Sequence, residues 1–194
     1  MCKHNAARNL VASFANKGGL HPALERPGLL QPSPEQPDAQ RRRPADVFLP
    51  SWEGGRPAAL DLAITCPQRQ DLRALAAQRS GAAAKAYEQT KREYLGTAAQ
   101  CEAQGFSFVP FVGETSGGWG PSAICTLKAF ARASAVRTGV ESGVIKTQQL
   151  QALGSAVRRS HARAVLRRDT GSDAPADTLV SAAAVLAETA PTSG

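Results

Sequence analysis

Two short apolar runs, each with a single acid inside it, lie in the first third of the chain. Residues 45–49 read Ala-Asp-Val-Phe-Leu, and residues 58–65 read Ala-Ala-Leu-Asp-Leu-Ala-Ile-Thr. Apolar runs of this length bounded by Pro and Gly are typical of strands, and the nearly continuous second run favours a strand that is covered on both faces. The connection at residues 50–57 contains a Gly-Gly pair. We therefore predict an antiparallel hairpin.

Helical spacing of apolar residues marks the regions on either side of this hairpin. Residues 4–17 show the period of one short amphipathic helix. Residues 70–104 are rich in Ala, Gln, Lys and Glu, with only Gly81 and Gly96 as weak interruptions. This long stretch predicts one helix, or two helices that meet near Gly81.

Two further strand candidates contain or adjoin proline. Residues 23–30 lie among prolines and predict an edge strand at best, and residues 31–43 are rich in Pro and Gln and predict a flexible loop. Residues 106–112 have the clearest strand composition, but Pro110 inside them implies an edge position or a bulge.

The chain returns to helical patterns after residue 121. Residues 122–137 and 144–168 predict a helical hairpin, and the second helix carries one apolar stripe: Leu150, Leu153, Val157, His161 and Val165. Residues 121–168 hold nine Lys or Arg and a single acid, Glu141. The hairpin is therefore strongly basic.

The order of these elements predicts an α/β fold, in which a mixed sheet is flanked by helices and followed by the basic helical hairpin. We expect a core at residues 1–120 and a basic helical extension at 121–168. Residues 169–194 consist largely of Ala, Ser, Thr, Asp and Pro, which predicts a largely disordered tail with one short helix at 178–188.

Composition and charge narrow the class of partner. The 194 residues are 42% hydrophobic but only 5% aromatic, and the formal net charge is +7. Such a charge favours a polyanionic partner, either nucleic acid or an anionic membrane surface. The sequence has neither a run of about 18 apolar residues nor the apolar segment of a signal peptide, and its four cysteines are scattered. We expect an intracellular protein with reduced thiols that does not enter a membrane.

Asp46 and Asp61 are the first candidates for chemistry, because a carboxylate among apolar strand residues costs several kcal/mol unless it is paired or bound to a metal. On neighbouring strands the two carboxylates would come close enough to share Mg²⁺, which takes one or two carboxylates and completes its shell with water and phosphate oxygens. The alternative is that each acid caps a loop or pairs with Arg43 or Arg56.

A lysine near such a metal would orient the attacking water and stabilise charge on the phosphate. The long helical stretch offers two candidates. Lys91 shares a face with Tyr87 and Tyr94, and Lys85 lies on another face. The alternative for either lysine is a solvated position.

Three further features have two interpretations each. Glu114 follows the last strand candidate and is either an auxiliary metal or water ligand or a solvated acid. Trp119 either stacks on a base or plugs the sheet edge. The basic ridge of the second hairpin helix either follows a phosphate backbone or solubilises the protein. The residues of this ridge are Arg158, Arg159, Arg163, Arg167 and Arg168.

Several short segments resemble the endonuclease domain found at the end of many site-specific non-LTR retrotransposon polyproteins. That domain belongs to the PD-(D/E)XK, or restriction-endonuclease-like, superfamily. The similar segments span residues 4–132 and are His4-Asn5-Ala6-Ala7-Arg8, Arg42-Arg43-Pro44-Ala45-Asp46-Val47, Ala59-Leu60-Asp61-Leu62-Ala63-Ile64-Thr65, Lys91-Arg92-Glu93-Tyr94 and Phe108-Val109-Pro110-Phe111-Val112-Gly113-Glu114-Thr115.

The resemblance implies a restriction-endonuclease-like core of αβββαβ order. By position it implies that Asp46 and Asp61 hold Mg²⁺ or Mn²⁺, and that Lys91 or Lys85 is the catalytic lysine, since Ala63 stands where the strand lysine is usual. Tyr94 and Glu114 are auxiliary candidates.

The implied activity is nicking of duplex DNA for target-primed reverse transcription. By their charge, Arg43 and the basic ridge are the candidates to contact the DNA. The implied location is the nucleus, and element RNA is a further candidate partner. Two other hypotheses remain: a catalytically inactive nucleic-acid-binding remnant of this domain, and a helical protein-interaction domain.

Overall fold

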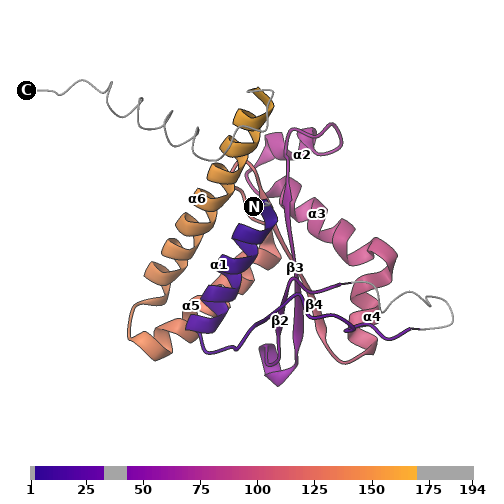
Figure 1. Ribbon diagram of the computed structural model, residues 1–194, viewed down its shortest axis with the longest axis vertical. Coiled ribbons are helices and arrows are strands. Elements are labelled where there is room, and N and C mark those ends of the chain that lie inside the picture. The colour runs from indigo at the N-terminus through magenta and orange to yellow at the C-terminus, as the bar shows by residue number, and fades with distance from the viewer. Residues whose placement is uncertain (1–2, 33–42, 170–194) are drawn as a thin grey trace, which may run out of the picture.

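A four-stranded mixed sheet forms the centre of the protein, and helices cover it on both sides (Figure 1). The computed structural model describes residues 3–32 and 43–169. The strands lie in the order β1-β2-β3-β4. Their bounds are β1 (Ala23–Leu24), β2 (Val47–Leu49), β3 (Ala58–Thr65) and β4 (Ser107–Glu114). The prediction of an α/β fold with a mixed sheet flanked by helices is confirmed.

The predicted hairpin of β2 and β3 is antiparallel, with Val47 opposite Leu60. Directly before β2, the Asp46 N–H donates to the Leu60 carbonyl at 2.9 Å, one position out of the register of the two strands. The Asp46 side chain reaches the backbone of β3 next to Asp61. A short 3-10 turn, η2 (Glu53–Gly55), lies in the connection between the strands.

β4 lies at the edge of the sheet and runs parallel to β3. The edge position predicted from Pro110 is confirmed, and Pro110 stands opposite Asp61 in the register. At the other edge, β1 has only two residues, far fewer than the predicted strand at 23–30. The part of the loop at residues 33–42 and the tail after residue 169 lie outside the described residues.

The stretch at residues 70–104 is not one helix. It forms α2 (Arg73–Gln78), α3 (Ala82–Glu93), η3 (Tyr94–Gly96) and α4 (Thr97–Ala103). Gly81 separates α2 from α3 with a positive φ of 83°, and Leu95 at φ 52° interrupts the chain between α3 and α4. The break near Gly81 was predicted, whereas the break at Leu95 was not.

α1 (Lys3–Lys17) and α5 (Pro121–Thr138) cover one face of the sheet, and α6 (Ser142–Asp169) packs against both of these helices. The larger hydrophobic cluster lies between them and the sheet, and it includes Val11, Leu60, Leu62, Phe130 and Leu153. The helical hairpin of α5 and α6 therefore shares a core with the strands. On the opposite face, a smaller cluster joins Ala59 and Phe108 of the strands to Cys101 of α4.

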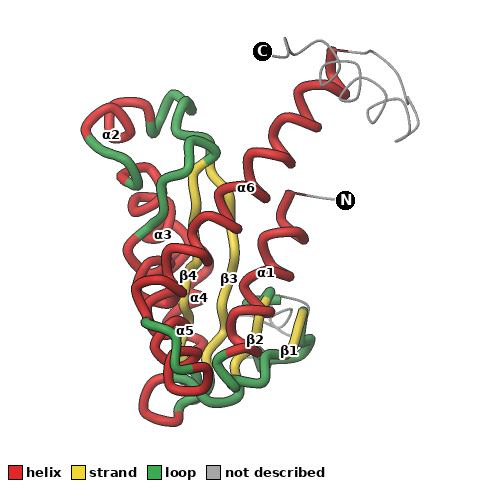
Figure 2. The backbone as a smooth tube through the Cα atoms, turned by 90° about the vertical axis from the view of Figure 1, so that its left-hand side faces the viewer, coloured by secondary structure: helices red, strands yellow, loops and turns green. Residues whose placement is uncertain are grey.

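α1 and α6 lie side by side and run in opposite directions (Figures 1 and 2). Of the predicted apolar stripe on α6, Leu153 and Val157 are buried, but His161 is exposed and Val165 is 51% exposed. The end of α6 extends past the sheet, so those two positions have no core to enter (Figure 2). Within the described residues, no helix is long and apolar enough to cross a membrane.

Candidate metal and catalytic site

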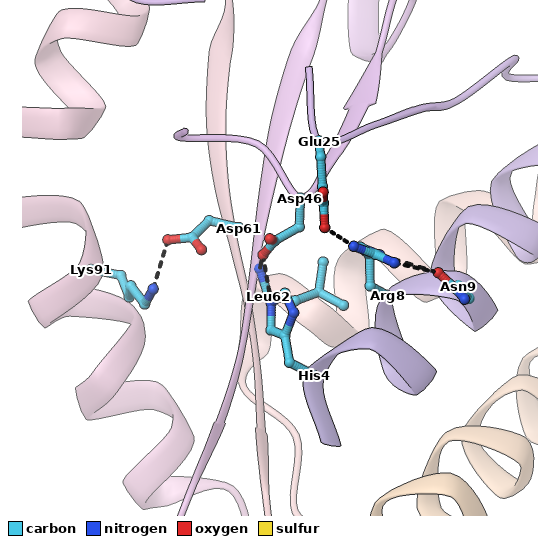
Figure 3. A network of polar contacts seen from close by, with 8 residues as sticks. All are labelled: His4, Arg8, Asn9, Glu25, Asp46, Asp61, Leu62 and Lys91. Atoms are coloured by element: carbon cyan, nitrogen blue, oxygen red, sulfur yellow. Dashed lines mark hydrogen bonds and ion pairs between the residues drawn. The ribbon is translucent and has the colours of Figure 1, made fainter. Parts of the chain in front are cut away.

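Asp46, directly before β2, is held by two donors from different elements. Its Oδ2 accepts the Leu62 N–H of β3 at 2.7 Å and lies 2.9 Å from His4 Nε2 of α1 (Figure 3). The hydrogen bond to Asp46 raises the pKa of His4 above its ordinary value, although burial acts in the opposite direction. The carboxylate thus favours the imidazolium form, in which Nε2 is a donor.

Asp61 is paired with Lys91. The Lys91 Nζ of α3 donates to Asp61 Oδ2 at 2.9 Å, and the two side chains are only 26% and 20% exposed (Figure 3). Burial raises the pKa of Asp61 above its ordinary value. Lys91 opposes that rise, and the negative charge of Asp46 adds to it. A carboxylate in this setting gains from any further cation that approaches it.

The two carboxylates lie near each other but point in different directions. Asp61 is directed toward α3, and Asp46 toward the beginning of α1 (Figure 3). Each has its own cationic partner, yet the charge of Asp46 is felt at Asp61. Arg43 and Arg56, the partners considered from sequence, are engaged elsewhere. Arg43 is 3.9 Å from Glu25, and Arg56 donates to backbone carbonyls.

Few side chains near the two aspartates could serve as metal ligands. Among residues 3–32 and 43–169, no three His, Cys, Asp or Glu side chains lie close enough together to hold a metal. A closed zinc centre needs four protein ligands, but Mg²⁺ commonly uses one or two carboxylates and keeps several waters. Two aspartates have the oxygen donors that Mg²⁺ or Mn²⁺ takes, and they are too few for a closed zinc site.

The two candidate lysines lie in different surroundings. Lys91 contacts Asp61, whereas Lys85 is exposed and lines a cavity beside α5. Tyr94 directly follows α3, at the C-terminal end of the helix. The Tyr94 side chain is 65% exposed.

Glu114 is buried, so the prediction of a solvated strand end is wrong. It is 2% exposed, its Oε1 accepts the Ala84 N–H at 3.1 Å, and its Oε2 accepts the Ser116 hydroxyl at 2.9 Å. Ala84 is in the first turn of α3, so Glu114 stabilises the beginning of that helix. The register puts it opposite Thr65, four residues or about 13 Å along the sheet from Asp61.

Trp119 packs against the sheet. Its ring makes an edge contact with Phe111 at a centroid distance of 5.7 Å, and it forms a bridge with Gly113. A Cβ on Gly113 would lie 2.5 Å from the indole ring. The structure therefore favours the interpretation in which Trp119 packs against the sheet edge over the one in which its ring stacks on a base.

The predicted nucleic-acid-binding arginines lie on two parts of the surface. Arg43 is 66% exposed near β1. Arg158, Arg159 and Arg163 are exposed on the second half of α6. Arg167 and Arg168 are on the same helix, but their side chains are outside the described set.

His4 and Arg8 were not chosen as site residues from the sequence. Arg8 forms an ion pair with Glu25 close to Asp46 (Figure 3). The sequence could have shown that His4 faces the core, because it lies three residues before Ala7 and seven before Val11, and residues with this spacing share one helix face. Ala7 and Val11 are buried, so His4 lies on the inward face of α1.

A scan against protein-family models and searches of curated proteins and of solved structures found no match to this chain. Evidence for the function therefore comes from the residues of the site.

Proposed function

We propose that the protein is a metal-dependent DNA endonuclease in which Asp46 and Asp61 hold Mg²⁺ or Mn²⁺. One observation carries this proposal. The Lys91 ammonium lies 2.9 Å from the largely buried carboxylate of Asp61, and the Asp46 carboxylate accepts the N–H of Leu62, the residue after Asp61. Two acids and a lysine at a sheet surface are the groups that hydrolysis of a phosphodiester needs.

Each residue has a role that its contacts support. The Leu62 N–H and His4 fix the orientation of the Asp46 carboxylate. Lys91 would donate to the attacking water or to a phosphate oxygen, where the charge develops. A bound divalent cation supplies positive charge at the phosphate and lowers the pKa of its water.

The architecture supports a restriction-endonuclease-like core. A helix precedes an antiparallel hairpin that carries both acids, and a helical crossover then leads to a parallel edge strand. The resemblance to retrotransposon endonuclease domains points to nicking of duplex DNA for target-primed reverse transcription. It also points to a nuclear location and to element RNA as a second partner.

α6 is suited to hold the DNA beside the acids. Because α1 and α6 are antiparallel neighbours, the end of α1 that carries His4 lies along the second half of α6 (Figure 2). The exposed residues Arg158, Arg159 and Arg163 are on that half. Such arginines bind phosphates without reading sequence.

A second candidate is a nucleic-acid-binding module without cleavage. The observation that favours it is the internal pairing of both acids, Asp46 with His4 and Asp61 with Lys91. In such a module these pairs would be structural.

Incubation with supercoiled plasmid separates the two candidates. The parent protein is expected to nick the plasmid with Mg²⁺ or Mn²⁺ and to be inactive in EDTA. Asp61→Ala should abolish nicking, and Asp71→Ala is the matched control because Asp71 is exposed and paired with Arg69. Salt-sensitive plasmid binding by the parent without any nicking would support the binding module.

A further inference from the structure

A cavity of about 550 Å³ lies between α2, α3 and the beginning of α5. Its volume is in the range of small-ligand sites. The polar and charged residues of its wall include Arg79, Lys85, Glu88, Gln89, Arg92 and Ser122. Three of these carry a positive charge and one is an acid.

Arg92 has a fixed position in this wall. Its guanidinium donates to the Ser122 hydroxyl at 2.7 Å and to the Phe108 carbonyl, on the edge strand β4, at 3.4 Å. These two contacts use two of the five N–H groups of the guanidinium. A guanidinium held in this way loses less conformational entropy when it binds an oxyanion.

Glu88 offsets part of the charge of Arg92, but its carboxylate is buried against α5. It is 3% exposed, and its carboxylate accepts the N–H groups of Ser122 and Ala123 at 3.1 and 3.3 Å. Its charge is therefore directed at the beginning of α5, and burial raises the pKa of this carboxyl. Gly120 permits the arrangement, since a Cβ there would collide with the Glu88 carboxylate.

The cavity is separate from the pair of aspartates. Lys85 and Arg92 are seven residues apart and share one face of α3, whereas Lys91 is turned toward β3 and Asp61. Arg92 instead contacts β4 and the beginning of α5. The cavity and the aspartates thus lie on different flanks of α3.

We infer that this cavity binds a phosphate group of a nucleic-acid strand through Arg79, Lys85 and Arg92. Arg92 has the planar geometry for a phosphate, and Lys85 and Arg79 add charge from neighbouring positions. The inference rests on the nucleic-acid partner of the proposed function but does not require cleavage.

The test is the salt dependence of DNA binding, measured by fluorescence anisotropy with a labelled 20-bp duplex in EDTA. Arg79→Ala with Lys85→Ala removes two exposed charges from the cavity. Arg73→Ala with Lys128→Ala removes the same two residue types from exposed positions outside it. Circular dichroism checks that both double variants are folded.

The slope of log K against log salt reports released counterions, at about 0.9 per phosphate contact in duplex DNA. The cavity variant is expected to lower the slope by up to about 0.9, while the control variant keeps the slope of the parent. Equal slopes in all three proteins, or equal losses in both variants, would overturn the inference.

Inorganic phosphate distinguishes a strand from a free anion as the source of the phosphate group. At constant ionic strength, millimolar inorganic phosphate should leave the complex of parent and duplex intact. Binding of inorganic phosphate by the parent but not by the cavity variant, together with equal salt slopes for the duplex in both proteins, would assign the cavity to free phosphate and overturn the strand assignment. Nicking activity is measured separately. Cleavage at the aspartates and phosphate binding in the cavity can therefore each be refuted without refuting the other.

Discussion

Lys91 and Asp61 are thirty positions apart in the chain and form a partly buried ion pair of 2.9 Å that joins α3 to β3. The pair fixes the rotation of α3 about its axis as well as its distance from the sheet. Removing one partner of such a pair leaves the other in a low-dielectric setting with its charge uncompensated.

Lys91→Met keeps the length of the side chain and removes its charge. We expect nicking to fall by about 10²–10³-fold, because a donor aimed at the developing charge is lost. The free energy of unfolding at neutral pH should also fall, by about 1–3 kcal/mol, since Asp61 stays buried without its cation. Plasmid nicking and urea denaturation measure the two effects.

Lys128→Met is the matched control, since Lys128 is exposed on α5. The stability loss of Lys91→Met should shrink in acid, because protonated Asp61 needs no counterion. Full nicking by Lys91→Met would exclude Lys91 from the reaction.

His4→Gln tests the contact between α1 and Asp46 through pH. The folded pKa of His4 is raised above its ordinary value of 6.5, so its stabilisation is fully present below about pH 6.5 and is lost as pH rises through the raised pKa. In urea titrations in EDTA, the parent should exceed His4→Gln in stability at pH 6, and the difference should narrow toward pH 9. If the difference in stability stays constant or widens, the contact with Asp46 does not favour the protonated form of His4.

Glu114→Gln distinguishes a structural acid from a metal ligand. The amide retains one acceptor for the Ala84 N–H but loses the charge at the beginning of α3. We expect a loss of about 1–2 kcal/mol in unfolding free energy, with the nicking rate per folded molecule unchanged. A variant of parental stability that cannot nick DNA would instead make Glu114 part of the metal site.

Gly113→Ala and Gly154→Ala form a pair that tests the packing of Trp119. A Cβ at Gly113 meets the indole ring, whereas a Cβ at Gly154 meets nothing within 4 Å. We expect Gly113→Ala to cost about 1–3 kcal/mol through overpacking. Gly154→Ala should gain up to about 1 kcal/mol, because alanine favours helix. Thermal denaturation measures the melting temperatures of both variants. Equal melting temperatures would contradict the packing of Trp119 against Gly113.

The hairpin that carries the two aspartates could be predicted from sequence because its signals are local. The apolar runs, the single acids within them and the glycine pair between them all lie within about twenty residues. Pro110 likewise marked an edge strand by its own chemistry, since proline cannot donate to a sheet ladder. These features need no knowledge of distant contacts.

The other features of the fold and of the site depend on tertiary contacts, which the local sequence does not show. The choice between Lys85 and Lys91 depends on how α3 is rotated, which the ion pair with Asp61 and the Glu88 contacts at α5 determine. Gly81 is required because a Cβ there would lie 2.7 Å from the Trp119 carbonyl, in a loop almost forty residues away. The positive φ of Leu95 has no signal in its residue type.

In the proposed function, Asp46 and Asp61 form one site for a divalent cation. Isothermal titration of Mn²⁺ into the parent, Asp46→Asn and Asp61→Asn tests it directly, with Asp71→Asn as the exposed control. We expect one Mn²⁺ per parent or control chain and a loss of at least about tenfold in affinity for each site variant. Equal Mn²⁺ affinity in all four proteins would contradict it.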